Sequence, residues 1–136
     1  MEIAARPSLE FARISYLRSG SSPRKTPLNP TLYGWVVENL CKNAIDAMEG
    51  DGTITIVASQ DARKIYIDIS DTGRGMTPAV QKRIFDSGFT TKTRGWGLGL
   101  PLARRIINQY HRGRLYLKYS IPNQGSCFRI VLRKKQ

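Results

Sequence analysis

Apolar residues recur every three or four positions between residues 30 and 48, which predicts a helix with one buried face. Asn29 or Thr31 is suited to cap its start, and Pro30 to occupy its first turn. Gly50 and Gly52 follow its end. The apolar face consists of Leu32, Trp35 or Val36, Leu40, Ala44 and Ala47, up to Met48.

Four shorter segments alternate apolar and polar residues, the pattern of strands that are buried on one face. Residues 53–59 and 63–70 form a predicted hairpin with a turn around Gln60 and Asp61. Residues 114–120 and 126–132 form a second hairpin around a Pro-Asn-Gln-Gly turn. The segment SLEFARISY, residues 8–16, is a candidate for a further strand.

Two more helices are predicted in the second half of the chain. A short one begins at Pro78 and runs to about Ile84, and a longer one runs from Leu98 to Tyr110. Residues 19–30 and 86–97 lack a sustained period and are predicted to be loops. This order of elements favours helices, about three in number, on one face of a largely antiparallel sheet.

The length of 136 residues and the 40% apolar content predict one domain over residues 1–136, in which residues 1–27 supply a strand and a loop. The N-terminus does not resemble a signal peptide, and no apolar run approaches about 18 residues, so we expect a soluble cytoplasmic segment. Cys41 and Cys127 are interpreted as buried apolar side chains rather than a disulfide framework.

The charge is strongly unbalanced. The chain carries 22 Lys and Arg against 10 Asp and Glu, a formal net charge of +12, so it should attract anionic partners such as nucleic acid. The basic residues are dispersed rather than gathered in one stripe with aromatic residues, which disfavours general nucleic-acid binding. Their clusters lie at residues 82–83, 92–94, 104–105, 112–114 and 133–135.

Two amides lie one turn apart in the predicted first helix. Asn39 and Asn43 are separated by four residues and therefore project from the same face. Amide oxygens are hard ligands, and Mg²⁺ usually completes its shell with water and substrate phosphate. The pair is a candidate magnesium-phosphate site, and the alternative is two asparagines that are solvated or hydrogen-bonded within the protein.

The sequence DTGRGM, residues 71–76, ends a predicted strand on a carboxylate and adds two glycines. An ionised Asp71 only accepts hydrogen bonds, and the amino group of adenine is a donor. Gly73 and Gly75 allow a ligand to approach the backbone closely. The alternative is an ordinary turn at the end of a strand.

The sequence GWGLGL, residues 95–100, precedes the long C-terminal helix. A helix start presents free N–H groups and the positive end of the helix dipole, which suits a polyphosphate. Lys92 and Arg94 either add cationic contacts to phosphate or remain solvated loop charges. The segment is neither a Walker loop nor a Rossmann fingerprint, because no Gly-Lys-Ser/Thr follows and no predicted β-α-β crossover surrounds it.

These motifs and two others occur in a characteristic order. ENLCKNAIDAM, DTGRGM, IFDSGFTTK, GWGLGL and NQGSCF resemble the N box, first glycine box, F box, second glycine box and terminal glycine motif of sensor histidine kinase catalytic domains, which share a wider family with gyrase, Hsp90 and MutL. The resemblance covers about residues 28–132. It implies a two-layer α/β sandwich of the Bergerat type, with a mixed, largely antiparallel sheet, that binds ATP and Mg²⁺ beneath a flexible lid at residues 76–96.

The resemblance also implies roles for individual residues. Asn43 corresponds to the magnesium ligand, and Asp71 to the carboxylate that binds the adenine amino group. Glu38, Asn39 and Lys92 are the candidate catalytic residues near the phosphates. The nucleotide site as a whole comprises Asn39, Asn43, Asp71, Gly73, Gly75, Met76, Phe85, Phe89, Thr90, Thr91, Lys92, Gly95, Gly97, Leu98, Gly99, Leu100 and Ser126.

Glu38 departs from the gyrase pattern. In gyrase-like ATPases a glutamate four residues before the metal-binding asparagine activates water, whereas here Asn39 holds that position and Glu38 lies five residues before Asn43. The extra residue rotates Glu38 by about 100° around the helix. We therefore expect ATP to be used for phosphoryl transfer rather than hydrolysis, with Glu38 either tuning the metal shell or solvated or paired with the lid.

The implied function is that of the ATP-binding catalytic domain of a two-component sensor histidine kinase. Such a domain positions Mg-ATP for γ-phosphoryl transfer to a histidine on a separate dimerisation domain, and signal transduction continues by phosphorelay to a response regulator. The chain has no long helical hairpin, and its one histidine, His111, is interpreted as structural. We therefore expect the acceptor domain elsewhere in a parent protein, for which both a membrane-anchored and a cytoplasmic form are considered. The segment itself is expected to be a monomer without membrane contact.

Three alternatives remain at this point. A stand-alone serine kinase of the anti-sigma-factor type would be complete as a single domain. A gyrase- or MutL-like ATPase would hydrolyse ATP and carry Glu at the position of Asn39. A non-enzymatic basic module would bind an anion without catalysis.

Overall fold

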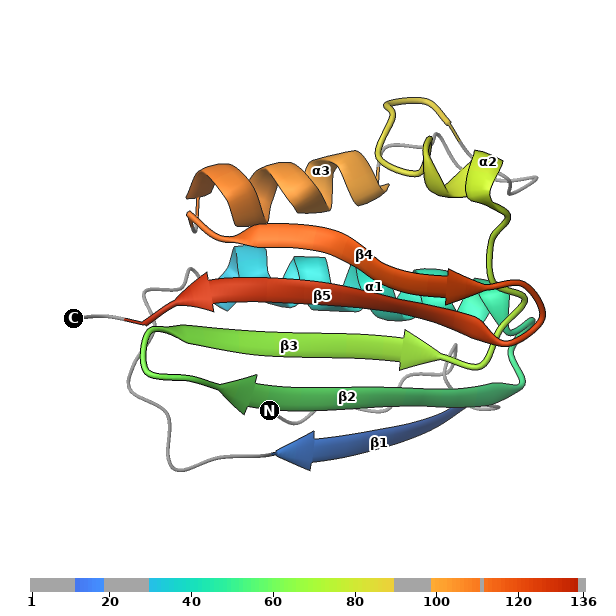
Figure 1. The fold of residues 1–136 in the computed structure, drawn as a ribbon, viewed down its shortest axis with the longest axis horizontal. Helices are drawn as coiled ribbons and strands as arrows, with labels where there is room; N and C mark the ends of the chain where they lie inside the picture. Colours follow the sequence, from blue (N-terminus) through green and yellow to red (C-terminus); the bar gives the residue numbers. More distant parts are fainter. Residues whose placement is uncertain (1–11, 19–29, 90–98, 111, 135–136) are drawn as a thin grey trace.

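A five-stranded sheet with helices on one face makes up the computed structural model, which describes residues 12–18, 30–89, 99–110 and 112–134 (Figure 1). This confirms the predicted architecture. In chain order the elements are β1 (Ala12–Arg18), α1 (Pro30–Ala47), β2 (Gly52–Gln60), β3 (Lys64–Asp71), α2 (Pro78–Gln81), α3 (Gly99–Arg105), the π-helical segment η2 (Ile106–Tyr110), β4 (Arg114–Ile121) and β5 (Gly125–Arg133).

The strand order across the sheet is β1-β2-β3-β5-β4. The two predicted hairpins form the antiparallel pairs β2–β3 and β4–β5, β3 and β5 are antiparallel as well, and among the described strands only β1 pairs parallel to its neighbour, β2. A parallel pair needs a crossover, and α1 supplies it between β1 and β2. β1 covers residues 12–16 of the candidate N-terminal strand and continues to Arg18, and residues 8–11 lie outside the described residues.

The core lies between α1 and the inward face of the sheet. Val36, Leu40 and Ala44 of α1 are buried, whereas Trp35 is 38% exposed, so Val36 rather than Trp35 continues the apolar face. Across the sheet, Ile56 is opposite Ile69 and Ile67 is opposite Ile130, which places apolar side chains in rows beneath the helix. Burial of one such side chain contributes about 1.5–3 kcal/mol.

Two predicted helices are shorter or less regular than their patterns indicate. α2 is capped by Thr77, whose side chain accepts from the Val80 N–H, and it ends at Gln81 instead of Ile84. Beyond it the Arg83 N–H donates to the Val80 carbonyl, a bond to the residue three positions back, so the chain continues in turns. The last helix changes from α to π geometry after Arg105.

Both cysteines are buried and free, as their interpretation as apolar side chains requires. Burial raises the pKa of each thiol to about 11, so both are protonated at neutral pH. Among the described helices, none combines the length and the apolarity that crossing a bilayer demands.

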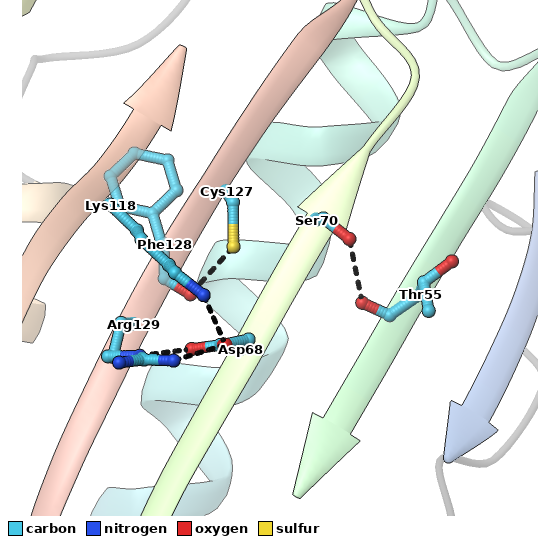
Figure 2. Close-up of polar contacts among 7 residues, drawn as sticks. All are labelled: Thr55, Asp68, Ser70, Lys118, Cys127, Phe128 and Arg129. Carbon is cyan, nitrogen blue, oxygen red and sulfur yellow. Dashed lines mark hydrogen bonds and ion pairs between the residues drawn. The ribbon is translucent and has the colours of Figure 1, made fainter.

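A charged cluster ties three strands together on the face of the sheet that is opposite the core. Figure 2 shows Arg129 of β5 and Lys118 of β4 both reaching Asp68 of β3. Arg129 Nε and Nη2 donate to the two carboxylate oxygens at 2.7 and 2.8 Å, and Lys118 Nζ lies 3.1 Å from Oδ2. Burial acts to raise the pKa of Asp68, but the hydrogen bonds from Arg129 and Lys118 outweigh it and hold that pKa below its ordinary value.

Replacement of this carboxylate should destabilise the fold. Asp68→Ala leaves Arg129 without its bidentate acceptor, so we expect the free energy of unfolding to fall by about 1.5–3 kcal/mol in urea titrations at neutral pH. Because the pKa of Asp68 is lower in the folded than in the unfolded chain, this contribution is present above the unfolded pKa and disappears as the pH falls through the folded pKa. Lys118→Ala is the control and should cost less, since Lys118 makes one bond from a side chain that is 39% exposed. Equal costs for the two variants at neutral pH would contradict this description.

Candidate functional site

The carboxylate of Asp71 stands at the end of β3, as the sequence predicts. Its Oδ1 accepts the N–H of Gly73 at 2.8 Å and the N–H of Ser126 at 3.3 Å. Burial raises the pKa of Asp71, and the two backbone hydrogen bonds oppose that rise. No described residue donates to Oδ2, so this oxygen keeps an acceptor position for a ligand.

The two glycines after Asp71 are required by close packing. A Cβ on Gly73 would lie 2.6 Å from the carbonyl oxygen of Ala47, the last residue of α1. The N–H of Arg74 donates to that same carbonyl at 3.0 Å. Gly75 has a φ of +65°, and a Cβ there would overlap the carbonyl of Ile121. The loop is thus fixed between the end of α1 and the β4–β5 hairpin.

The terminal glycine motif reaches the same place from the other end of the chain. Gly125 has a φ of +125°, and a Cβ on it would overlap the carbonyl of Asp71. Ser126, which is 4% exposed, follows directly and supplies the second N–H to the carboxylate. Asn123 N–H donates to the carbonyl of Arg74 at 2.7 Å. The hairpin tip therefore packs on the loop that carries Asp71.

The two asparagines lie upstream of Ala47 in the same helix, Asn43 one turn before it and Asn39 near the middle of α1. A Cβ on Gly99, the first residue of α3, would be 2.8 Å from Asn39 Oδ1, so the start of α3 rests on Asn39. Asn39 Nδ2 is buried and has no hydrogen-bond partner among the described residues. Asn43 follows one turn later and is half-buried. Glu38 forms an ion pair with Lys42 at 3.4 Å.

Helix α1 therefore connects two predicted motifs. Asn39 touches the start of α3, and Ala47 touches the loop after Asp71. Eight residues of helix separate these contacts by about 12 Å, with Asn43 at the middle. The unpartnered Asn39 amide fits a ligand with acceptor oxygens, and the amide oxygen of Asn43 is of a type that Mg²⁺ accepts.

Three of the predicted aromatic and apolar site residues pack against the edge of the core. The ring of Phe85 meets that of Phe128 edge-on, with 6.3 Å between the ring centres. The guanidinium of Arg104 lies 4.4 Å from the centre of the Phe85 ring. Phe85, Met76 and Leu100 are partly buried against the core. Phe89 lies beneath Arg83, at 4.5 Å.

Several predicted site residues lie outside the described residues. They are Thr90, Thr91, Lys92, Gly95, Gly97 and Leu98, and His111 also lies there. Conversely, the pattern of the sequence did not single out Ser120 or Gln81, both of which bond to the loop that carries Asp71. The one signal for Ser120 was a hydroxyl within a strand, which is too common to be informative.

Comparisons with known proteins agree with this geometry. The model of the histidine kinase-, DNA gyrase B- and HSP90-like ATPases matches residues 29–136. The signal transduction histidine-protein kinase AtoS of Escherichia coli (strain K12) is 38% identical over 125 residues, which are 89% of this chain and 20% of that protein. The adaptive-response sensory kinase SasA of Rippkaea orientalis is 37% identical over 114 residues, with 76% of this chain and 29% of that protein covered.

A solved structure of a histidine kinase catalytic domain has the same fold. The catalytic domain of histidine kinase ThkA superposes with a TM-score of 0.79 at 26% identity, over 92% of this chain and 82% of that one. The chain belongs to the family of histidine kinase-, DNA gyrase B- and HSP90-like ATPases. Within it, this segment is an ATP-binding catalytic domain of the histidine kinase type. It spans only 20% and 29% of the two curated relatives above.

The packing of the glycine loop can be tested without a ligand. Gly73→Ala should lower the free energy of unfolding by about 1–3 kcal/mol in urea titrations, because the added methyl group overlaps the Ala47 carbonyl. Gly34→Ala is the matched control within α1, where a Cβ meets nothing within 4 Å. It should stabilise the protein by about 0.5–1 kcal/mol. A neutral Gly73→Ala substitution would show that the loop is not held against α1.

Proposed function

We propose that this segment holds Mg-ATP along α1 and presents its γ-phosphoryl group to a histidine on the dimerisation domain of a longer parent protein. The observation that carries the proposal is the order of polar groups along the helix. The Asp71 loop lies at its C-terminal end, Asn43 lies one turn before that end, and Asn39 with the start of α3 lies one turn further back, near the middle of the helix. This order matches that of the adenine base, the metal ion and the phosphates of a bound Mg-ATP.

At the base end, Asp71 would accept the adenine amino group through its remaining oxygen. Its other oxygen is held by two backbone N–H groups, so the carboxylate is oriented before the ligand arrives. The raised pKa of Asp71 makes this interaction sensitive to acid: protonation removes the charge, and adenine binding weakens as the pH falls through that pKa.

At the phosphate end, Asn39 would donate its unpartnered amide to a phosphate oxygen, and Asn43 would hold the metal. When bound, Mg-ATP supplies the transferable phosphoryl group and the cation that neutralises its charge. Thr90, Thr91, Lys92, Gly95 and Gly97 stay predicted contacts of the lid and phosphate loop. Binding and orientation in this site are the contribution of the chain.

Transfer is favoured over hydrolysis by the residues of α1. Asn39 occupies the position that a water-activating glutamate takes in gyrase-like ATPases, and Glu38 pairs with Lys42. The relatives described above are named as sensor or signal transduction kinases, which favours a histidine acceptor over the serine kinase, ATPase and basic-module alternatives. The response regulator would be reached indirectly, through that acceptor domain.

Asp71→Asn separates ligand binding from folding. Asn keeps the Oδ1 acceptor for Gly73 and Ser126 but replaces the ionised oxygen with an NH₂ donor that faces the adenine amino group. We expect ATP affinity in isothermal titration calorimetry with Mg²⁺ to fall by about 10- to 100-fold, which corresponds to a lost charge-assisted bond of about 1.5–3 kcal/mol.

The melting temperature of the ligand-free Asp71→Asn variant should equal or exceed that of the wild type at neutral pH. A carboxyl whose pKa is raised by folding stabilises the fold below its unfolded pKa, and that contribution is lost as the pH rises through the folded pKa. Asp51→Asn, an exposed control outside the site, should change neither quantity. Unchanged ATP affinity in Asp71→Asn would remove the adenine assignment.

A further inference from the structure

Ser120 and Ser126 face each other across the β4–β5 hairpin. They are paired in the register of the two strands, and their hydroxyl oxygens are 2.7 Å apart. Ser126 is buried, and its backbone N–H is one of the two that orient Asp71. Among the described residues, the Ser126 hydroxyl has one hydrogen-bond partner, the hydroxyl of Ser120 on the neighbouring strand.

Ser120 also holds the chain that follows Asp71. Its hydroxyl accepts the N–H of Met76 at 2.8 Å. Its carbonyl accepts from Gln81 Nε2 at 3.3 Å, and the same nitrogen donates to the Met76 carbonyl at 2.9 Å. Both backbone polar groups of Met76 are thus hydrogen-bonded. Its N–H donates to the Ser120 hydroxyl, and its carbonyl accepts from the Gln81 side chain, which also donates to the Ser120 carbonyl.

One hydroxyl therefore joins two parts of the proposed nucleotide site. In one direction the Ser120 hydroxyl bonds to the Ser126 hydroxyl, and the backbone N–H of the same Ser126 donates to the Asp71 carboxylate. In the other direction the Ser120 hydroxyl accepts the N–H of Met76, and the backbone carbonyl of Ser120 accepts from Gln81 Nε2, at the start of the segment predicted to close over the ligand. A serine hydroxyl has one donor and two acceptor positions, which suffices for both contacts at once.

We propose that Ser120 is a positioning residue for the adenine end of the nucleotide. Its hydrogen bonds couple the orientation of Asp71 to the position of residues 76–81. The inference rests on the proposed function, since it assigns the base to Asp71. A positioning role at this end has a specific signature. Every ligand that contains adenine should be affected by the same factor, whatever the number of its phosphates.

The test compares Ser120→Ala with Ser120→Thr by calorimetric titration of ATP, ADP and adenosine. Ser120→Ala should weaken all three by about 5- to 20-fold, the loss of roughly one hydrogen bond. Ser120→Thr retains the hydroxyl and suits a strand, so its affinities should return to within about twofold of the wild type. Ser70→Ala is the matched control: it removes a strand hydroxyl that bonds to the Thr55 carbonyl at 3.3 Å (Figure 2) and should leave all three affinities unchanged.

A second readout needs no ligand. Amide hydrogen exchange at Met76 should be at least about tenfold faster in Ser120→Ala than in the wild type, because that N–H loses its acceptor. It should slow again in Ser120→Thr and stay unchanged in Ser70→Ala. If Ser120→Ala does not fold, Ser120→Cys takes its place, since a thiol is a weak acceptor and should give the same direction of change.

The outcomes separate the inference from the proposed function. A wild type that does not bind ATP overturns both. A wild type that binds, with Ser120→Ala within twofold of it for all three ligands, overturns the role of Ser120 alone. A loss confined to ATP and ADP places the effect at the phosphates and also overturns it. An equal loss for all three ligands, with faster Met76 exchange and recovery in Ser120→Thr, supports it.

Discussion

The hydrogen bonds that hold the Asp71 carboxylate are the interaction on which the rest of the site depends. One comes from Gly73, two residues away, and the other from Ser126, at the far end of the chain. A half-buried carboxylate is costly to desolvate, and two N–H donors recover only part of that cost, as its raised pKa indicates. The fold thus keeps a destabilising charge at a strand end, which is typical of a residue retained for ligand binding.

The fold places this carboxylate by packing glycines against backbone. Gly73 approaches the end of α1, Gly75 approaches β4, and Gly125 approaches Asp71 itself, each at a point where a side chain would overlap a carbonyl. The glycines that the family resemblance assigns to ligand access are therefore equally explained by the docking of the loop. Both functions are compatible, because a loop fixed on two sides presents its remaining side to a ligand.

Much of this arrangement could be predicted from the sequence. The helical period of α1 and the alternation in the hairpins were sufficient to predict the sheet and its helical layer. The order of the five motifs was sufficient to predict the family. Local patterns could not reveal the parallel pairing of β1 or the part played by Ser120, because both depend on contacts between residues far apart in the chain. The ion pair of Glu38 with Lys42 follows helical spacing, whereas the roles considered for Glu38 at the metal shell or with the lid stay predictions.

The central claim is that α1 aligns base, metal and phosphate subsites in that order. A crystal structure of this segment with Mg²⁺ and a non-hydrolysable ATP analogue tests it most directly. The account predicts the adenine amino group within about 3.2 Å of Asp71 and the metal bound by the Asn43 side-chain oxygen. It also predicts that the phosphates lie between Asn39 and the start of α3. A nucleotide bound in the reverse direction, or on the opposite face of the sheet near Asp68, would contradict it.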